Sequence, residues 1–278
     1  MGSLDGQVAF ITGAARGQGR AHAVRLATDG ADIIGIDVPH ATPTIPHSLG
    51  TAADLAETVK QVEALGRRIV TYEVDVRDAA GVEAAVAEGV AALGRLDIVV
   101  ANAGVSQRLT NLWETTLEEW DDQIAINLTG VFNTIRATVP VLIAAERGGA
   151  IVLTSSGAGL AGVRNIGAYG AAKHGVVGLA KTLANEVARY DIRVNAMCPG
   201  TVGSPMVTGN ATQDAVFSPD VENPTLEHTK EVLRKVAPLG RPWLEPEDIA
   251  NAVAFLVGPS GRYITGIAMP VDQGVVNK

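Results

Sequence analysis

Residues 8–20, VAFITGAARGQGR, join an apolar segment to a helical one through a glycine-rich turn. Residues 8–11 form a short apolar run that predicts a buried strand, and residues 20–29, followed by Gly30, predict a helix. Glycines permit a tight turn and let a pyrophosphate approach the backbone, while the start of a helix offers free N–H groups and a positive dipole end. The stretch therefore predicts a dinucleotide-binding unit in preference to an ordinary glycine-rich turn.

Strand patterns and helix patterns alternate through the rest of the chain, which is typical of a parallel α/β sheet. Further strands are predicted at residues 32–36, 69–74, 98–101, 150–153 and 192–197. Helices are predicted at residues 52–65, after Asp78 as far as Leu93, from a capping box at Thr116 towards Val139, and around Tyr169. Polar residues and glycines follow the ends of successive strands, at the sheet edge where doubly wound folds bind ligands.

Asp37 ends the second predicted strand and bears on the choice of cofactor. A carboxylate at this position can accept hydrogen bonds from the adenosine ribose hydroxyls and would repel a 2′-phosphate. Arg16, in the glycine-rich turn, is an opposing signal, since a guanidinium could hold a 2′-phosphate. Because Asp37 occupies the ribose position itself, we expect NAD in preference to NADP.

Residues 38–51 contain three prolines and no helical period, so they predict a long loop. The loop starts beside Asp37, near the adenosine end of the cofactor site, where it is either a flap over the cofactor or a surface insertion. His40 and His47 lie within it, but no third ligand is near them in the sequence. We therefore predict no metal site.

Tyr169 and Lys173 are four residues apart in a helical pattern, which places both side chains on one face, one turn apart. A phenol has a reference pKa of about 10, too high for it to take up a proton at neutral pH. A neighbouring ammonium group favours the phenolate and lowers that pKa. The pair predicts Tyr169 as a general acid/base whose pKa is adjusted by Lys173.

Composition limits the functions open to the 278-residue chain. A hydrophobic share of 47% and 31 glycines suit an α/β protein with close helix–sheet packing. The net charge of -8 argues against nucleic-acid binding, and the apolar runs are shorter than the ~20 residues of a membrane span. Residues 1–6 show no secretory pattern, and the single cysteine, Cys198, fits a small buried side chain in a reducing compartment. We expect a cytoplasmic protein that binds neither nucleic acid nor membrane.

The order and spacing of these motifs resemble the short-chain dehydrogenase/reductase family along essentially the whole chain. The resemblance rests on Thr12-Gly13-x-x-x-Gly17-x-Gly19, Asn102-Ala103-Gly104, Asn127, Ser156, Tyr169-x-x-x-Lys173, Pro199-Gly200, Tyr263-Ile264-Thr265-Gly266 and Val271-Asp272-Gln273-Gly274. It implies a single Rossmann domain over residues 1–278, with a doubly wound, seven-stranded parallel sheet and helices on both faces. It also implies a homotetramer in which the helices containing Asn127 and Tyr169 pack against partner copies.

The resemblance further implies a role for each residue of the reaction centre. Ser156, 13 residues before Tyr169, would hydrogen-bond the substrate oxygen, whereas Ser155 is one residue out of register. Tyr169 would accept the hydroxyl proton as hydride passes to the nicotinamide, and Lys173 would lower the pKa of Tyr169 and hold the nicotinamide ribose. Asn127 would disturb its helix and hold a water that links Lys173 to solvent. The residues expected to contact the cofactor are Gly13, Ala15, Arg16, Gly17, Gln18, Gly19, Asp37, Val38, Asp75, Val76, Asn102, Ala103, Gly104, Thr154, Tyr169, Lys173, Pro199, Gly200, Thr201 and Val202.

Gln18 and the insertion at residues 38–51 resemble the actinobacterial carveol dehydrogenase-like, mycofactocin-associated branch of that family. This finer resemblance implies that the insertion buries NAD so that it does not exchange, and that mycofactocin then removes the electrons. Residues 203–240 are the expected substrate-binding loop and helix. Their apolar residues suit a hydrophobic secondary alcohol such as a monoterpenol: Met206, Val207, Val216, Phe217 and Leu226, where the helix is predicted to begin.

Three alternative functions stay open at this stage. An NADP-linked ketone or 3-oxoacyl reductase would use the same scaffold, and Asp37 argues against it. A non-catalytic NAD-binding sensor or assembly subunit is opposed by the intact set of Ser156, Tyr169 and Lys173. A metal-dependent alcohol dehydrogenase would need a cluster of ligands, which the sequence does not offer.

Overall fold

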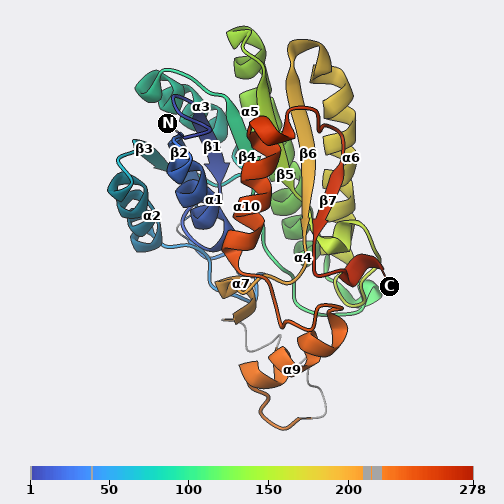
Figure 1. The fold of residues 1–278 in the computed structure, drawn as a ribbon. Helices are drawn as coiled ribbons and strands as arrows, with labels where there is room; N and C mark the ends of the chain where they lie inside the picture. Colours follow the sequence, from blue (N-terminus) through green and yellow to red (C-terminus); the bar gives the residue numbers. More distant parts are fainter. Residues whose placement is uncertain (1, 39, 209–213, 215–220, 278) are drawn as a thin grey trace.

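The computed structural model describes residues 2–38, 40–208, 214 and 221–277, and its centre is a parallel β-sheet (Figure 1). Within these residues seven strands lie in the order β3-β2-β1-β4-β5-β6-β7, and each neighbouring pair is parallel. The strands are β1 (Val8–Thr12), β2 (Asp32–Asp37), β3 (Ile69–Glu73), β4 (Ile98–Ala101), β5 (Gly149–Thr154), β6 (Ile192–Pro199) and β7 (Ala268–Val271). The predicted doubly wound, seven-stranded parallel sheet is therefore confirmed.

Helices cover both faces of this sheet (Figure 1). One face carries α1 (Gly17–Thr28), α2 (Ala52–Ala64) and α10 (Pro246–Val257), and the other carries α3 (Ala79–Leu93), α4 (Leu117–Ile124), α5 (Gly130–Ala145) and α6 (Gly167–Val187). The short α7 (Pro205–Thr208) and α9 (Leu226–Val236) lie beyond the carboxyl ends of the strands. The strand order turns back between β1 and β4, so a ligand-binding crevice is expected at that point of the edge.

Alternate residues of the central strands pack into hydrophobic layers on opposite faces of the sheet. Phe10 of β1 and Val99 of β4 belong to the layer under α3, α5 and α6, whereas Ile11 and Val100 belong to the layer under α1 and α10. Because both faces are covered, these strands are almost continuously apolar in sequence, as buried parallel strands usually are. Cys198 lies in the first of these layers and is fully buried, in agreement with its predicted role as a small apolar side chain.

The predicted helix after Thr116 is longer than expected and is not regular. Its start matches the sequence, because Thr116 forms the expected capping box before α4. A π-helical segment, Ala125–Thr129, then separates α4 from α5, and α5 continues through Pro140 instead of ending near residue 139. The final turn is held because Leu142 is buried in the core and α5 packs against α3. Tertiary packing therefore outweighs the helix-breaking tendency of proline at this point.

By length and composition alone, the helical run Leu117–Ala145 could cross a membrane, and it is the one helix in the described part of the chain that passes this test. Its side chains Asn127 and Asn133 are buried against the protein, at 0% and 5% exposure. The run packs on α3 and α6 as part of one layer over the sheet. We therefore interpret it as a core helix of this fold.

Candidate active site

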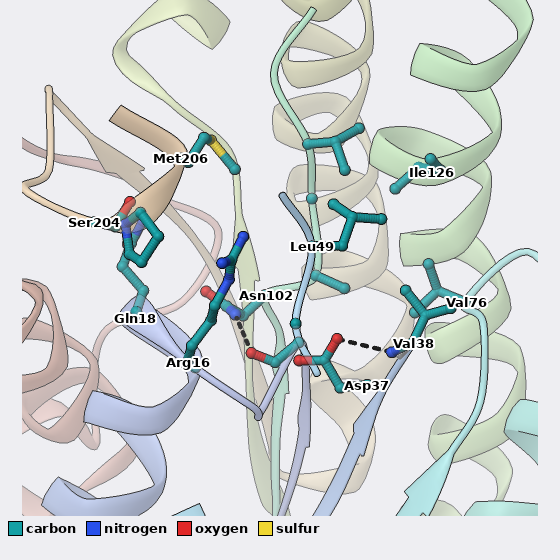
Figure 2. A pocket seen from close by; sticks show the side chains of 18 of the residues that line it. Arg16, Gln18, Asp37, Val38, Leu49, Val76, Asn102, Ile126, Ser204 and Met206 are labelled. Atoms are coloured by element: carbon teal, nitrogen blue, oxygen red, sulfur yellow. Dashed lines mark hydrogen bonds between the residues drawn. The ribbon is translucent and has the colours of Figure 1, made fainter. Parts of the chain in front are cut away.

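A cavity lies at the carboxyl edge of the sheet, beside the reversal in strand order (Figure 2). Its walls come from the turn after β1, the ends of β2, β3 and β4, the loop at residues 38–51, and residues 204–206. Figure 2 shows Arg16 and Gln18 on one side of it and Val76 and Ile126 on the other. The cavity is therefore at the edge where the sequence predicts a dinucleotide.

The glycine-rich turn is packed so closely that side chains would not fit. Gly13 has φ +69, and a Cβ there would lie 2.9 Å from the Cα of Ala103. A Cβ on Gly19 would lie 1.8 Å from the carbonyl oxygen of Gly13. Arg16, the residue before α1, makes no side-chain cap bond to the helix. A glycine turn leading into a helix without such a cap is the arrangement that binds a pyrophosphate.

Asn102 joins the end of β4 to the turn after β1. Its Nδ2 donates to the carbonyl oxygen of Thr12 at 3.0 Å and lies 3.5 Å from that of Gly13. The Thr12 hydroxyl in turn accepts from the backbone N–H groups of Asn102 and Ala103, both at 2.9 Å. These bonds fix the floor of the cavity at the point where β1 and β4 diverge.

Asp37 lines the cavity, and two backbone groups hold its carboxylate. Oδ2 accepts from the N–H of Ala15 at 2.7 Å, and Oδ1 accepts from the N–H of Val38 at 2.7 Å (Figure 2). Burial raises the pKa of Asp37, and these hydrogen bonds oppose that rise. The guanidinium of Arg16 donates to Oγ of Ser48 at 3.1 Å and to its carbonyl oxygen. Arg16 is thus bound to the loop at residues 38–51, whereas Asp37 lines the cavity at the end of β2.

The loop at residues 38–51 forms a wall of the cavity. His47 accepts from the backbone N–H of Ser106 through Nε2 at 3.2 Å, which joins the loop to the segment after β4. Thr44 donates to Oδ2 of Asp122 at 2.5 Å, which joins the loop to α4. Residues of this loop therefore line the cavity and are joined to two other parts of the chain.

Asp75 and Val76 line the cavity just beyond β3. The Asp75 carboxylate accepts from Nε and from the backbone N–H of Arg77, both at 2.9 Å, and Nε2 of His40 lies 4.0 Å from it. Among the residues that the structure describes, no group of three or more His, Cys, Asp or Glu side chains is placed to hold a metal ion.

Ser156, Tyr169 and Lys173 meet at the end of β5. The Ser156 side chain lies near enough to the Tyr169 hydroxyl to lower its pKa. Lys173 is 3% exposed, its Nζ donates to the carbonyl oxygen of Thr154 at 2.9 Å, and Nζ lies 5.6 Å from the centre of the Tyr169 ring. Oγ of Ser155 donates to the carbonyl oxygen of Lys173 at 2.8 Å, so this hydroxyl braces α6. Ser156 therefore lies beside Tyr169, whereas the Ser155 hydroxyl is bonded to the backbone of α6.

The pKa values in this group differ in one respect from the expectation. Burial raises the pKa of Tyr169, and the hydrogen bond from Ser156 opposes that rise. Burial also lowers the pKa of Lys173 to about 8. The net shift in the Tyr169 pKa is therefore upward, because the cost of ionising a buried phenol is larger than the effect of that hydrogen bond, and the contribution of Lys173 stays a prediction.

Asn127 lies in the π-helical segment Ala125–Thr129, so the predicted disturbance of its helix is present. Its Oδ1 accepts from the N–H of Val105 at 3.0 Å, and its Nδ2 donates to the carbonyl oxygen of Val105 at 3.1 Å. A Cβ on Gly104 would lie 2.8 Å from Oδ1 of Asn127 and 3.2 Å from Nζ of Lys173. Gly104 therefore allows the end of β4 to come close to both side chains.

The remaining predicted cofactor contacts fall into two groups. Gln18 and Thr154 each hold a buried oxygen, Oε1 and Oγ1, with no hydrogen-bond partner in the described chain. These atoms have bonding capacity left for a ligand. Thr154, Tyr169 and Lys173 lie outside the cavity lining among the described residues. So do the residues at and after the end of β6, which pack towards Leu244 and Asp272: Pro199, Gly200, Thr201 and Val202.

A family model described as enoyl-(acyl carrier protein) reductase matches residues 13–276. The chain belongs to the short-chain dehydrogenase/reductase family. A (-)-trans-carveol dehydrogenase of Rhodococcus erythropolis is 49% identical over 278 residues, covering 100% of both chains. The crystal structure of carveol dehydrogenase from Mycobacterium avium in complex with NAD has a TM-score of 0.98 at 48% identity, again over 100% of both chains. The 3-oxoacyl-(acyl-carrier-protein) reductase FabG of Thermotoga maritima is 34% identical over 98% of this chain and 99% of its own.

Sequence reasoning missed one side chain at the reaction centre of this short-chain dehydrogenase/reductase. Gln107, three residues after Gly104, is 3% exposed and accepts from the backbone N–H of Tyr169 through Oε1 at 2.8 Å. A glutamine in a polar loop gives no periodic or motif signal, because its partner lies 62 residues further along the chain.

Proposed function

We propose that this protein is an NAD-dependent dehydrogenase that interconverts a hydrophobic secondary alcohol, such as a carveol-like monoterpenol, and its ketone. The observation that carries the proposal is the meeting of Ser156, Tyr169 and Lys173 at the same sheet edge as a glycine-lined cavity that holds Asp37. Two carveol dehydrogenases are among the similar proteins, at 49% and 48% identity, which supports the substrate class.

The residues that line the cavity and those next to it fit NAD. Gly13 and Gly19 leave room for a pyrophosphate beside the first turn of α1. The buried oxygens of Gln18 and Thr154 have no partner among the described residues and can accept hydrogen bonds from the cofactor. Asp37 can bond the adenosine ribose and would repel a 2′-phosphate. When bound, NAD supplies the hydride acceptor of the reaction.

Ser156, Tyr169, Lys173 and Asn127 have complementary roles in the proposed reaction. Ser156 hydrogen-bonds the substrate oxygen, where charge develops in the transition state. Tyr169 takes the hydroxyl proton as the alcohol is oxidised, and returns it in the reverse direction. Lys173 favours the phenolate through its charge and holds the nicotinamide ribose. Asn127 holds a water that connects Lys173 to solvent as a proton relay.

Residues 203–240 are the proposed substrate-binding segment. Met206, in the short α7, already lines the cavity, and α9 begins at Leu226 as predicted. Val216 and Phe217, which the sequence also suggested for the pocket, lie outside the described residues. An apolar alcohol suits these side chains better than a charged one.

The loop at residues 38–51 supports a captive cofactor. It is bonded to three separate parts of the chain, through Ser48 to the glycine-rich turn, through His47 to the segment after β4, and through Thr44 to α4. NAD enclosed behind this loop would be reduced without leaving. We therefore propose that an external electron acceptor, such as mycofactocin, re-oxidises it in place.

The deciding experiment is the amount of NADH formed per protomer when purified protein meets excess carveol and excess free NAD. A rise in absorbance that stops near one NADH per subunit, and resumes only with an artificial electron acceptor, supports the captive cofactor. A steady climb means that NAD exchanges freely and that the flap does not retain it. Bound NAD without any NADH would contradict the substrate class.

An NADP-linked 3-oxoacyl reductase is the second candidate, because FabG of Thermotoga maritima is similar over the whole chain. Asp37 opposes it, since a carboxylate repels the 2′-phosphate. Initial rates with NAD and NADP separate the two candidates. A Tyr169→Phe protein that behaves like wild type would instead support a non-catalytic NAD-binding role.

We also propose a cytoplasmic homotetramer in which α5 and α6 pack against partner copies. Phe132 on α5 is 46% exposed, and a Cβ on Gly178 of α6 would face open space, so both positions are available to a partner. Gly175 is different, because a Cβ there would lie 2.9 Å from the Leu128 side chain of the same chain. A monomer in light scattering would refute this assembly.

A further inference from the structure

The N-terminus of α6, which carries Tyr169, has no cap from its own preceding residue. Ile166 precedes the helix at φ -132 and ψ 44 and makes no side-chain cap bond. The first N–H groups of a helix have no partner within the helix and need one from elsewhere. The N–H of Tyr169 has such a partner in Oε1 of Gln107, at 2.8 Å, although Gln107 lies on the segment after β4.

Gln107 is itself held firmly. It is 3% exposed, and its Nε2 donates to the carbonyl oxygens of Arg108 at 3.2 Å and Asn165 at 3.4 Å. The N–H of Thr110 donates to the same carbonyl of Asn165 at 3.0 Å, and Thr110 forms a parallel bridge with Ile166. Residues 105–110, here called the strap, are thereby paired with the residues that lead into α6.

The other end of the strap is fixed at the candidate proton relay and at the cofactor loop. Val105 exchanges two hydrogen bonds with the side chain of Asn127, and the N–H of Ser106 donates to His47. The strap therefore connects the loop over the cavity, the π-helical segment and the first turn of α6. Gln107 is its contact with the backbone of Tyr169.

Lys173 and Tyr169, the candidate acid/base pair, are held in place by different hydrogen bonds. Lys173 is held by Thr154 through its Nζ and by Ser155 through its carbonyl oxygen. Tyr169, one turn earlier, has its backbone N–H held by Gln107. A small displacement of that first turn would move the phenol relative to Ser156 without moving Lys173.

We infer that Gln107 is a positioning residue, which holds the Tyr169 backbone so that the phenol keeps its register with Ser156. This inference rests on the proposed dehydrogenase function, because it assigns Tyr169 to proton transfer. Gln107 acts through Tyr169 and not on the substrate. Displacement of a catalytic group by about 1 Å lowers turnover by roughly 100-fold, so the loss of this bond should affect kcat more than cofactor binding.

The test compares Gln107→Leu, which removes both amide groups, with Gln107→Glu, which keeps an acceptor for the Tyr169 N–H. The matched control is Gln61→Leu, the same chemical change on α2, where the glutamine amide bonds only Glu57 among the described residues. We expect Gln107→Leu to lower kcat by roughly 10- to 100-fold and to shift the alkaline limb of its pH profile. Its affinity for NADH should stay within about three-fold of wild type, and Gln107→Glu should recover part of the turnover, because its carboxyl group keeps the acceptor but faces the carbonyl oxygens of Arg108 and Asn165.

Hydrogen exchange of the peptide that contains Tyr169 gives a second measurement that needs no turnover. Its first-turn amides should exchange faster in Gln107→Leu and at the wild-type rate in Gln61→Leu. Wild-type kcat and pH profile in Gln107→Leu would overturn the positioning role while the dehydrogenase proposal stands. If wild type itself oxidises no alcohol, the proposed function fails, and unchanged exchange at Tyr169 would then overturn this inference as well.

Discussion

Replacement of Lys173 by methionine tests the electrostatics of the candidate site through stability. Burial lowers the pKa of Lys173 from 10.5 to about 8. At 1.36 kcal/mol per pKa unit this difference corresponds to about 3 kcal/mol. Because the folded protein binds fewer protons than the unfolded chain between about pH 8 and the ordinary lysine pKa, wild-type stability should rise with pH across that window. Below about pH 8 the full cost of the charged, buried side chain is present.

The assay is urea denaturation of cofactor-free wild type and Lys173→Met, from about pH 7 to about pH 11. Tyr169 and Cys198 also titrate at high pH in both proteins, and Cys198 interacts with Lys173, so the difference between the two free energies of unfolding reports Lys173 together with this interaction. That difference should move in favour of wild type by about 3 kcal/mol as pH rises. A difference that stays flat with pH would show an ordinary, hydrated lysine and refute the reasoning.

Three further predictions follow from the same geometry. Ser156→Ala should lower kcat by roughly 100-fold or more. Ser155→Ala should keep the turnover and lose about 1–3 kcal/mol of stability. Equal losses of kcat in the two variants would count against separate roles of the two hydroxyls. Gly19→Ala should abolish NADH binding in a fluorescence titration while circular dichroism stays native, since its Cβ would lie 1.8 Å from the Gly13 carbonyl oxygen; retained binding would mean that the turn can relax. Asp37→Ser should lower kcat/KM for NAD by roughly 10-fold and raise that for NADP, and an unchanged ratio of the two values would remove Asp37 from cofactor selection.

The parts of the fold that could be predicted from the sequence are those set by local chemistry. The strand Ile98–Ala101 has the predicted boundaries, and the helix Leu226–Val236 begins at the predicted residue. Asp78 accepts from the N–H of Gly81 at the start of α3, as its position before the helix indicated. Each of these features depends on periodicity or capping within a few residues, so a single stretch of sequence carries the information.

The features that could not be predicted depend on partners far apart in the chain. Arg16 bonds Ser48 instead of standing free for a 2′-phosphate, and Gln107 bonds the backbone of Tyr169. The raised pKa of Tyr169 is also a consequence of tertiary burial, whereas its spacing from Lys173 indicated the opposite direction. Helix α5 passes through Pro140 because the core and α3 hold its last turn, which no local propensity reports.

The strap at residues 105–110 and the hydroxyl of Ser155 hold the first turns of α6 from the β4 and β5 side, whereas Ser204, Pro205 and Met206 line the cavity from beyond β6. If the proposed function holds, the residues of the reaction and the segment proposed to select the alcohol belong to different parts of the chain. Exchange of residues 203–240 with the matching segment of a relative should transfer the donor's selectivity and keep the recipient's turnover. The same separation offers gene duplicates a short route to new substrates, since the braced half of the enzyme need not change.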